Sequence, residues 1–310
     1  MATDDKPRVC DYETMDYRRD FWGSGNREYE DAVERIALAK LLPQRGQWCV
    51  ELGAGFGRLA DLYRERYERV VLVDYCRPLL QQARERLGSP PGLFLVVGDV
   101  YNLPFADAVF DVATMVRVLH HIEDPPACLA EVHRVMRSRG SYVLEYANKR
   151  NVKEVARFLL GRSKRDTHSR DPSMLDDLYF NYHPAYVKAR LRETGFRVRA
   201  ERSVSLFRTP ILKRHIGARP LVALDARLQG PLGRFQVSPS IFVSCEVEKA
   251  PSPALTVDEP PWRCPQCHAT ELMKMPELLV CPRCRAEWSV ADGIYDFKAP
   301  VGATGAARPC

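Results

Sequence analysis

Residues 50–58 read Val-Glu-Leu-Gly-Ala-Gly-Phe-Gly-Arg, an apolar run that leads into three alternating glycines. The apolar run predicts a buried strand, and residues 59–66 beyond the glycines have a helical pattern. Glycine lets the backbone turn sharply and lets a ligand approach without a Cβ in between. A helix start adds unpaired N–H groups at the positive end of the helix dipole. The segment therefore predicts a strand, an anion-binding loop and a helix, in that order.

On both sides of this loop, strand-like apolar runs alternate with amphipathic helical stretches, from about Trp48 to Val247. The alternation is typical of a parallel sheet with helices on both faces. We therefore predict an α/β fold, a doubly wound, mostly parallel, Rossmann-like sheet of seven strands. The strands are expected at 49–52, 70–73, 93–97, 109–115, 141–145, 196–203 and 241–246, and the helices at 27–42, 59–66, 78–87, 126–136 and 184–194.

The composition excludes several classes of protein. With 45% hydrophobic and 28% charged residues in 310, the chain can bury a core, which excludes wholesale disorder and collagen-like repeats. The longest apolar runs are far shorter than the ~18 residues of a membrane span, so none is predicted. The amino terminus is acidic where a secretory signal is basic and then apolar, and this favours a cytoplasmic location.

Four of the ten cysteines form two Cys-x-x-Cys pairs near the carboxyl end. The pairs are Cys264 with Cys267 and Cys281 with Cys284, separated by thirteen residues. Four thiolates at this spacing suit a closed, tetrahedral, structural Zn²⁺ site, with redox disulfides as the alternative. Residues 279–284 and the tail that follows resemble small zinc-ribbon proteins that activate certain methyltransferases.

A proline-dense stretch over residues 251–261 predicts a linker. It divides the chain into a main domain over 1–250 and a zinc ribbon over 262–300, with a flexible tail over 301–310. Within the main domain we expect a helical cap over 1–44 and a basic substrate lid over 147–195. Aromatic side chains ahead of the first helix either form a flap over a pocket or simply pack, and these are Tyr12, Tyr17, Phe21 and Trp22.

Glu51 stands two places before Gly53, so the loop has the form Glu-x-Gly-x-Gly-x-Gly. It resembles the first motif of class I S-adenosylmethionine-dependent methyltransferases. A dinucleotide fingerprint would instead need glycine or alanine three places after Gly55, where the chain has Arg58. Asp74 closes the next strand 21 residues after Gly53, and the later motifs follow in order over about residues 45–200. A nicotinamide-dependent dehydrogenase and a non-catalytic scaffold are the competing hypotheses.

The resemblance implies that S-adenosylmethionine is the cofactor and assigns roles to single residues. Asp74 would accept the ribose hydroxyls, Asp99 would receive the adenine amino group, and Val100 would flank the ring. Backbone near Val116 and Arg117 would line the methionine end. The complete expected cofactor set is Glu51, Gly53, Ala54, Gly55, Gly57, Asp74, Tyr75, Asp99, Val100 and Arg117.

The acceptor is expected to be a small molecule, because residues 102–105 and 119–122 look closest to the branch that includes quinone-biosynthesis enzymes. An RNA or protein methyltransferase that uses the ribbon for docking is the alternative. The sequence indicates neither a catalytic residue nor an oligomeric state. Histidine and tyrosine side chains that could take a proton, or equally cap helices and fill the core, are His120, His121, Tyr179, Tyr182 and His183.

The positive charge of the chain is local. Residues 147–170 carry eight basic and two acidic side chains, so the net charge of this segment, +6, equals the net charge of the whole chain. An acidic substrate, an anionic lipid surface or RNA would suit such a segment, and a solvated helix is the alternative. The predicted ribbon has equal numbers of basic and acidic side chains, so it would attract the phosphates of a nucleic acid only weakly.

Overall fold

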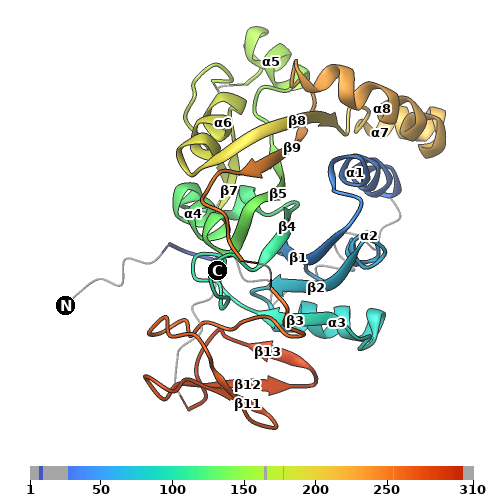
Figure 1. Ribbon diagram of the computed structural model, residues 1–310. Helices are drawn as coiled ribbons and strands as arrows, with labels where there is room; N and C mark the ends of the chain where they lie inside the picture. Colours follow the sequence, from blue (N-terminus) through green and yellow to red (C-terminus); the bar gives the residue numbers. More distant parts are fainter. Residues whose placement is uncertain (1–6, 10–26, 164–165, 177, 254, 303–310) are drawn as a thin grey trace.

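The structure, a computed structural model, describes residues 7–9, 27–163, 166–176, 178–253 and 255–302 (Figure 1). Most of the expected cap ahead of residue 27 and the tail from residue 303 lie outside this part of the chain, as do the aromatic residues considered for a flap. No helix in the described part is long and apolar enough to cross a membrane.

All seven predicted strands form, and they lie side by side in one sheet (Figure 1). Their order is β3-β2-β1-β4-β5-β9-β8, with β3 to β5 parallel and β9 antiparallel to both of its neighbours. This arrangement confirms the α/β fold with a mostly parallel sheet in this region. The strands are β1 Gly46–Leu52, β2 Tyr67–Asp74, β3 Leu93–Val97, β4 Phe110–Met115, β5 Met136–Ala147, β8 Phe196–Val204 and β9 Ser240–Val247.

The prediction of seven strands was wrong for the sheet as a whole, which has eleven. The four additional strands come from residues 262–300, called here the cysteine module, and β13 pairs in parallel with β3 at the edge of the sheet. An exposed strand edge presents unpaired N–H and C=O groups, so covering β3 satisfies backbone that a seven-stranded sheet would leave open. The added strands are β10 Met273–Lys274, β11 Leu278–Val280, β12 Glu287–Ala291 and β13 Ile294–Asp296.

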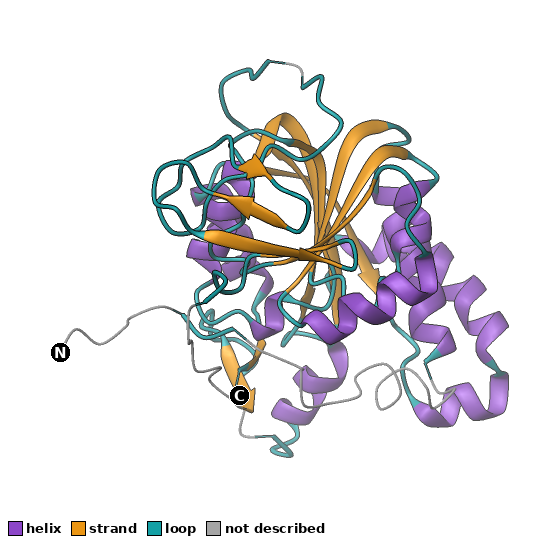
Figure 2. Ribbon diagram, turned by 90° about the horizontal axis from the view of Figure 1, so that it is seen from below, coloured by secondary structure: helices purple, strands orange, loops and turns teal. Residues whose placement is uncertain are grey.

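Helices cover both faces of the sheet, as Figures 1 and 2 show. The predicted helices form as α1 Glu28–Leu41, α2 Ala60–Arg64, α3 Arg77–Leu87, α4 Pro125–Val135 and α6 Pro184–Glu193. The Asp124 side chain caps α4 by accepting the Ala127 N–H at 3.1 Å. The structure adds elements that the sequence pattern missed, namely α5 Val152–Leu159, α7 Pro210–Ile216, α8 Ala218–Gly233, the 3₁₀ turn Leu119–His121 and the hairpin β6 Ser173–Asp176 with β7 Tyr179–Asn181.

Two apolar clusters fill the space between the sheet and its helices. On β1, Trp48 and Val50 join the cluster under α4 and α6, while Cys49 joins the cluster under α1 to α3. This alternation follows from the two-residue period of a strand. Because β1 to β5 are parallel, their carboxyl ends meet at one edge of the sheet, where open α/β sheets bind ligands.

Candidate active site

The three glycines after β1 have different surroundings. All lie in the left-handed region, with φ of 71° at Gly53, 54° at Gly55 and 70° at Gly57. A Cβ at Gly53 would collide with Val118, and one at Gly57 would lie 3.0 Å from Leu87 on α3. A Cβ at Gly55 would approach only Leu79, at 4.0 Å. Gly57 therefore serves the packing of the loop against α3, whereas Gly55 borders open space.

That open space is a pocket at the carboxyl ends of β1 and β2. Eight of the ten expected cofactor residues line it, namely Glu51, Gly53, Ala54, Gly55, Asp74, Tyr75, Val100 and Arg117. Gly57 and Asp99 do not line it. Asp99 accepts the Tyr101 N–H at 2.8 Å in the loop after β3. The pocket also includes residues that the sequence reasoning did not assign to it, among them Arg58, Val118 and Ile122.

Asp74 ties the glycine loop to the end of β2. One carboxylate oxygen accepts the Gly55 N–H at 2.7 Å, and the other accepts the Cys76 N–H at 2.9 Å. The backbone of Gly53 and Ala54 donates in turn to the carbonyl of Val73, at 2.8 and 2.9 Å. These bonds hold the loop and the acid in one rigid rim of the pocket.

Glu51 brings a buried carboxyl group to the pocket wall. Its side chain is 3% exposed, and its Oε1 accepts the Tyr63 hydroxyl at 3.2 Å. Its Oε2 is buried without a hydrogen-bond partner among the described residues. Burial raises the pKa of Glu51 to about 8, although the charge of Arg58 acts in the opposite direction. The group is therefore largely protonated at neutral pH, and it forms no ion pair with any of the described residues.

Glu34 of α1 joins two arginines of the pocket wall. Its buried carboxylate pairs with Arg58, at 2.8 Å, and with Arg117. Burial opposes its ionisation, but the charges of Arg117 and Arg58 overcome that cost and hold the pKa of Glu34 below its usual value. The backbone N–H of Arg117 donates to buried Glu145 at 2.9 Å, which fixes a residue with a φ of 61°. The first helix is thus locked to the loop after β4.

Of the proton-transfer candidates, His121 lines the pocket. Its Nδ1 lies 3.0 Å from the Leu178 carbonyl oxygen. Because a carbonyl only accepts, Nδ1 carries the proton in the neutral ring and Nε2 carries a lone pair. Burial lowers the pKa of His121, so the neutral ring is the main form at pH 7. His120 is more deeply buried, between the His121 and Tyr179 rings, and burial puts its pKa well below the usual value.

The other three candidates, Tyr179, Tyr182 and His183, have structural partners and do not line the pocket. The Tyr182 hydroxyl lies 3.0 and 3.1 Å from the carbonyl oxygens of Leu119 and Ile122. His183 accepts the Ala185 N–H at 3.1 Å and so caps α6. Tyr182 thus fixes the 3₁₀ turn after β4, and His183 fixes the start of α6.

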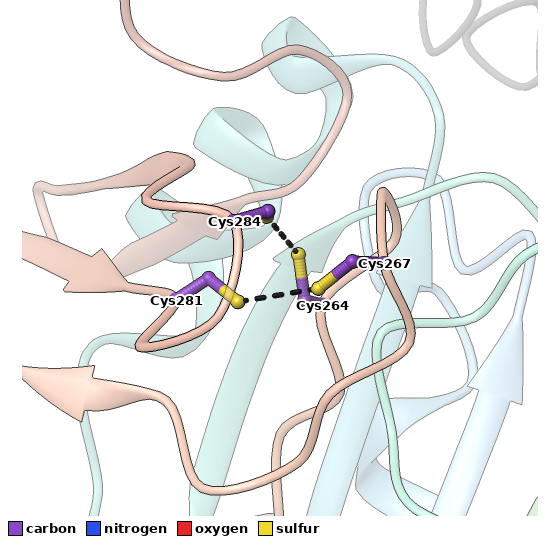
Figure 3. Close-up of side chains that lie close together, drawn as sticks. All are labelled: Cys264, Cys267, Cys281 and Cys284. Carbon is purple, nitrogen blue, oxygen red and sulfur yellow. Dashed lines mark hydrogen bonds between the residues drawn. The ribbon is translucent and has the colours of Figure 1, made fainter.

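The four cysteines of the carboxyl-terminal pairs converge, as Figure 3 shows. Their sulfur atoms all lie within 4.8 Å of one another, with 3.6 Å between Cys264 and Cys284 and 3.4 Å between Cys267 and Cys281. A tetrahedral Zn²⁺ with bonds of about 2.3 Å would space its sulfurs by about 3.8 Å. A disulfide would need about 2.05 Å. The donor set and its spacing fit a metal ion.

The cysteine module contacts the loops that surround the pocket. The Asn102 side chain donates to the Pro265 carbonyl at 2.8 Å, in the loop after β3. Trp262 packs on Phe105 with ring centroids 5.7 Å apart. The Lys298 ammonium lies 4.2 Å from the ring centre of Tyr75, which lines the pocket. The module is thus attached next to the candidate site.

Residues 50–144 match a family model described as a methyltransferase domain. The demethylmenaquinone methyltransferase of Thermobifida fusca is 35% identical over 101 residues, which are 32% of this chain and 43% of that protein. The malonyl-[acyl-carrier protein] O-methyltransferase of Serratia marcescens is 34% identical over 121 residues, 38% of this chain and 46% of that protein. The chain spans less than half the length of these curated relatives.

Solved structures agree on the fold. A Haloferax volcanii complex of the Trm112 methyltransferase activator with a methyltransferase matches with a TM-score of 0.54 and 18% identity, over 75% of this chain and 96% of that chain. A Listeria monocytogenes protein described as an S-adenosylmethionine-dependent methyltransferase matches with a TM-score of 0.51 and 15% identity, over 71% of this chain and 99% of that one. Residues 50–144 are thus similar to a methyltransferase domain, and the solved structures share the α/β fold around the pocket. The family model and the two curated relatives are all described as methyltransferases.

Proposed function

We propose that this protein transfers a methyl group from S-adenosylmethionine to a small-molecule acceptor. The observation that carries the proposal is the pocket at the ends of β1 and β2, where Gly55 borders open space between the carboxyl groups of Asp74 and Glu51. A nucleoside with a cationic amino-acid tail has the hydroxyl and ammonium groups that such a pocket would bind. When bound, this cofactor supplies a methyl group already activated on sulfur.

The pocket residues would divide the binding between them. Asp74 lies at the end of β2, the position from which a carboxylate would accept both ribose hydroxyls. The Glu51 oxygen without a partner would accept the ammonium group of the methionine end. Val100 and Tyr75 would flank the adenine ring. Asp99 does not line the pocket, so its expected contact with the amino group of adenine stays a prediction.

The reaction is an in-line displacement, for which alignment of the acceptor can supply roughly 7 to 11 kcal/mol of the barrier. A base is required only if the acceptor atom must lose a proton. His121 would serve then, because it lines the pocket and its neutral ring carries a lone pair on Nε2. The small-molecule class of the acceptor is supported by the relatives, whose names specify demethylmenaquinone and malonyl-[acyl-carrier protein].

We further propose that Cys264, Cys267, Cys281 and Cys284 hold a structural Zn²⁺ ion. The four thiolates would fill its coordination shell and leave no open position for catalysis. The ion would keep together the two loops from which β11, β12 and β13 extend to the edge of the main sheet.

Calorimetry with S-adenosylhomocysteine, S-adenosylmethionine and NAD tests the cofactor. We expect binding of the first two and none of NAD, whereas binding of NAD alone would support the competing dehydrogenase hypothesis. Incubation with methyl-labelled cofactor and fractionated cell extract tests the acceptor. Label in the small-molecule fraction is the expected result, and label confined to RNA or protein would contradict it.

A further inference from the structure

The basic segment after β5 places apolar side chains at the surface. Its helix α5 is amphipathic, with Val152, Val155 and Leu159 in one stripe and Lys153 and Arg157 on the other side. Such a stripe normally packs on a core. Here α5 buries none of its residues, and Val152 is 61% exposed and Leu159 71% exposed. Val152 and Leu159 of this stripe are therefore not covered by the described part of the chain, whereas Val155 is half-buried.

A second helix repeats this feature. The helix α7 also buries no residue, and its Ile211 and Ile216 are 67% and 50% exposed. Its last turn carries the exposed basic side chains of Arg214 and His215. Aliphatic and cationic groups thus lie side by side on α7 as they do on α5.

The two helices border one groove of about 650 Å³. Val152 and Lys153 come from the start of α5, Pro210 comes from the start of α7, and Leu228 and Leu232 of α8 form part of the wall. The strands that precede these helices, β5 and β8, are parallel to each other because both are antiparallel to β9. Their carboxyl ends, and hence the groove, lie on the same edge of the sheet as the cofactor pocket.

Part of the positive charge of this surface is unpaired, although Lys213 of α7 and Arg208 of the groove pair with Glu30. Lys153, Arg162 and Arg214 have no side-chain partner among the described residues, whereas Arg157 pairs with Glu154 at 3.6 Å. Anions from another molecule would therefore meet unpaired cations. RNA would also be attracted, but surfaces that bind single-stranded RNA use aromatic side chains on which bases stack. The exposed apolar side chains of α5 and α7 and of neighbouring Leu160 are aliphatic, namely Val152, Leu159, Leu160, Ile211 and Ile216. The aromatic Phe158 and Phe207 are half-buried, and Phe235, two residues before the groove residue Val237, is the exposed aromatic side chain of this region among the described residues.

We propose that α5, α7 and the groove between them form a docking surface for an anionic lipid bilayer. The helices would lie in the plane of the interface, with aliphatic side chains among the acyl chains and Lys and Arg at the headgroups. This orientation would turn the edge of the sheet that carries the cofactor pocket toward the membrane. Figure 1 shows the cysteine module at the opposite end of the molecule from α5, away from this surface.

Sedimentation of the full chain with vesicles tests the proposal without any cofactor, so its outcome is independent of methyl transfer. We expect binding to vesicles of phosphatidylcholine mixed with phosphatidylglycerol, and at least about tenfold weaker binding to phosphatidylcholine alone. Added salt should weaken the binding. Absence of binding to the mixed vesicles, or equal binding to both kinds, contradicts the proposal.

Two double variants separate the apolar from the electrostatic contribution. Leu159→Asp with Leu160→Asp should weaken binding by about tenfold or more, and Lys153→Gln with Arg162→Gln by about fivefold per charge. The side chains are exposed, so thermal unfolding should be unchanged. Met275→Asp is the matched control, because Met275 is 53% exposed but belongs to the cysteine module. Wild-type binding by both double variants, or capture of short RNA in place of vesicles, overturns the proposal.

Discussion

Gly55 and Gly57 offer a matched pair of substitutions at the scale of single residues. Both have positive φ, so alanine brings similar backbone strain of about 1 to 2 kcal/mol at either position. The new methyl group in Gly57→Ala also crowds Leu87 and Leu72. The new methyl group in Gly55→Ala enters pocket space.

We therefore expect Gly55→Ala to weaken binding of S-adenosylhomocysteine by about tenfold or more, with the smaller loss of stability. Gly57→Ala should lose more stability and less affinity. Calorimetry and urea unfolding of both variants measure the two effects. The reverse order of affinities would place the ligand elsewhere.

The buried carboxyl of Glu51 makes stability depend on pH. Its folded pKa of about 8 lies above the ordinary value, so the folded state holds a proton that the unfolded state releases. Stability is therefore highest below the unfolded pKa and falls as pH rises through about 8, by roughly 3 to 5 kcal/mol at most. Glu51→Gln should remove this fall. Urea unfolding at several pH values measures it, and parallel curves for the two proteins would contradict the assignment.

The position of His121 predicts a pH profile. Burial lowers its pKa, so the ring is neutral at pH 7 and becomes charged only in acid. If the acceptor loses a proton to this ring, kcat falls as the pH drops below the pKa of His121. The variant His121→Gln should then have a lower kcat that no longer changes with pH over this range. His183→Gln is the comparison, because His183 caps α6. An unchanged profile in His121→Gln assigns proton transfer to another group or to none.

At the scale of elements, the attachment of α1 to the pocket wall depends on the buried carboxylate of Glu34. Glu34→Gln would leave the guanidinium groups of Arg58 and Arg117 without their common counter-charge, although each side chain is only 12% exposed. We expect a loss of about 3 kcal/mol in the free energy of unfolding. The control is Glu28→Gln, an exposed acid on the same helix, with a change within about 0.5 kcal/mol. Equal losses in the two variants would show that the buried pairs do not hold α1.

The helices that the sequence pattern did not predict have a feature in common. Predicted helices such as α3 and α4 carry a proline in the first turn and an apolar face that packs on the sheet. The missed helices α5 and α7 bury no residue, and α8 contains Pro231 in its interior. α5 has no proline in its first turn, α7 has Pro210 there but no buried face, and α8 is interrupted by Pro231, so none of the three shows the full pattern of α3 and α4.

For the whole molecule, metal removal tests how the cysteine module is attached. A chelator should unfold the module, because so few residues cannot form a stable core without the ion. Loss of β13 would expose the edge of β3 and release Trp262 from Phe105. We expect a lower Tm and a red-shifted tryptophan emission that zinc restores. Cys264→Ser with Cys267→Ser should show the same changes without chelator, and a chelator without effect on either readout would argue against the metal site.

The sequence alone determined the seven central strands, the glycine loop with its following helix, and the pairing of the cysteines, because each is a local pattern of residue types. The expected cofactor residues came from the resemblance to a family, and eight of the ten line the pocket. The tertiary structure decided the rest: that the cysteine module extends the sheet through β3, that Glu34 of α1 holds two arginines of the pocket, and that α5 and α7 leave apolar stripes uncovered. These features join residues far apart in the chain. Contacts between distant residues depend on unpaired strand edges, on buried charges and on the fit of packed side chains. A local pattern of residue types contains no information about them.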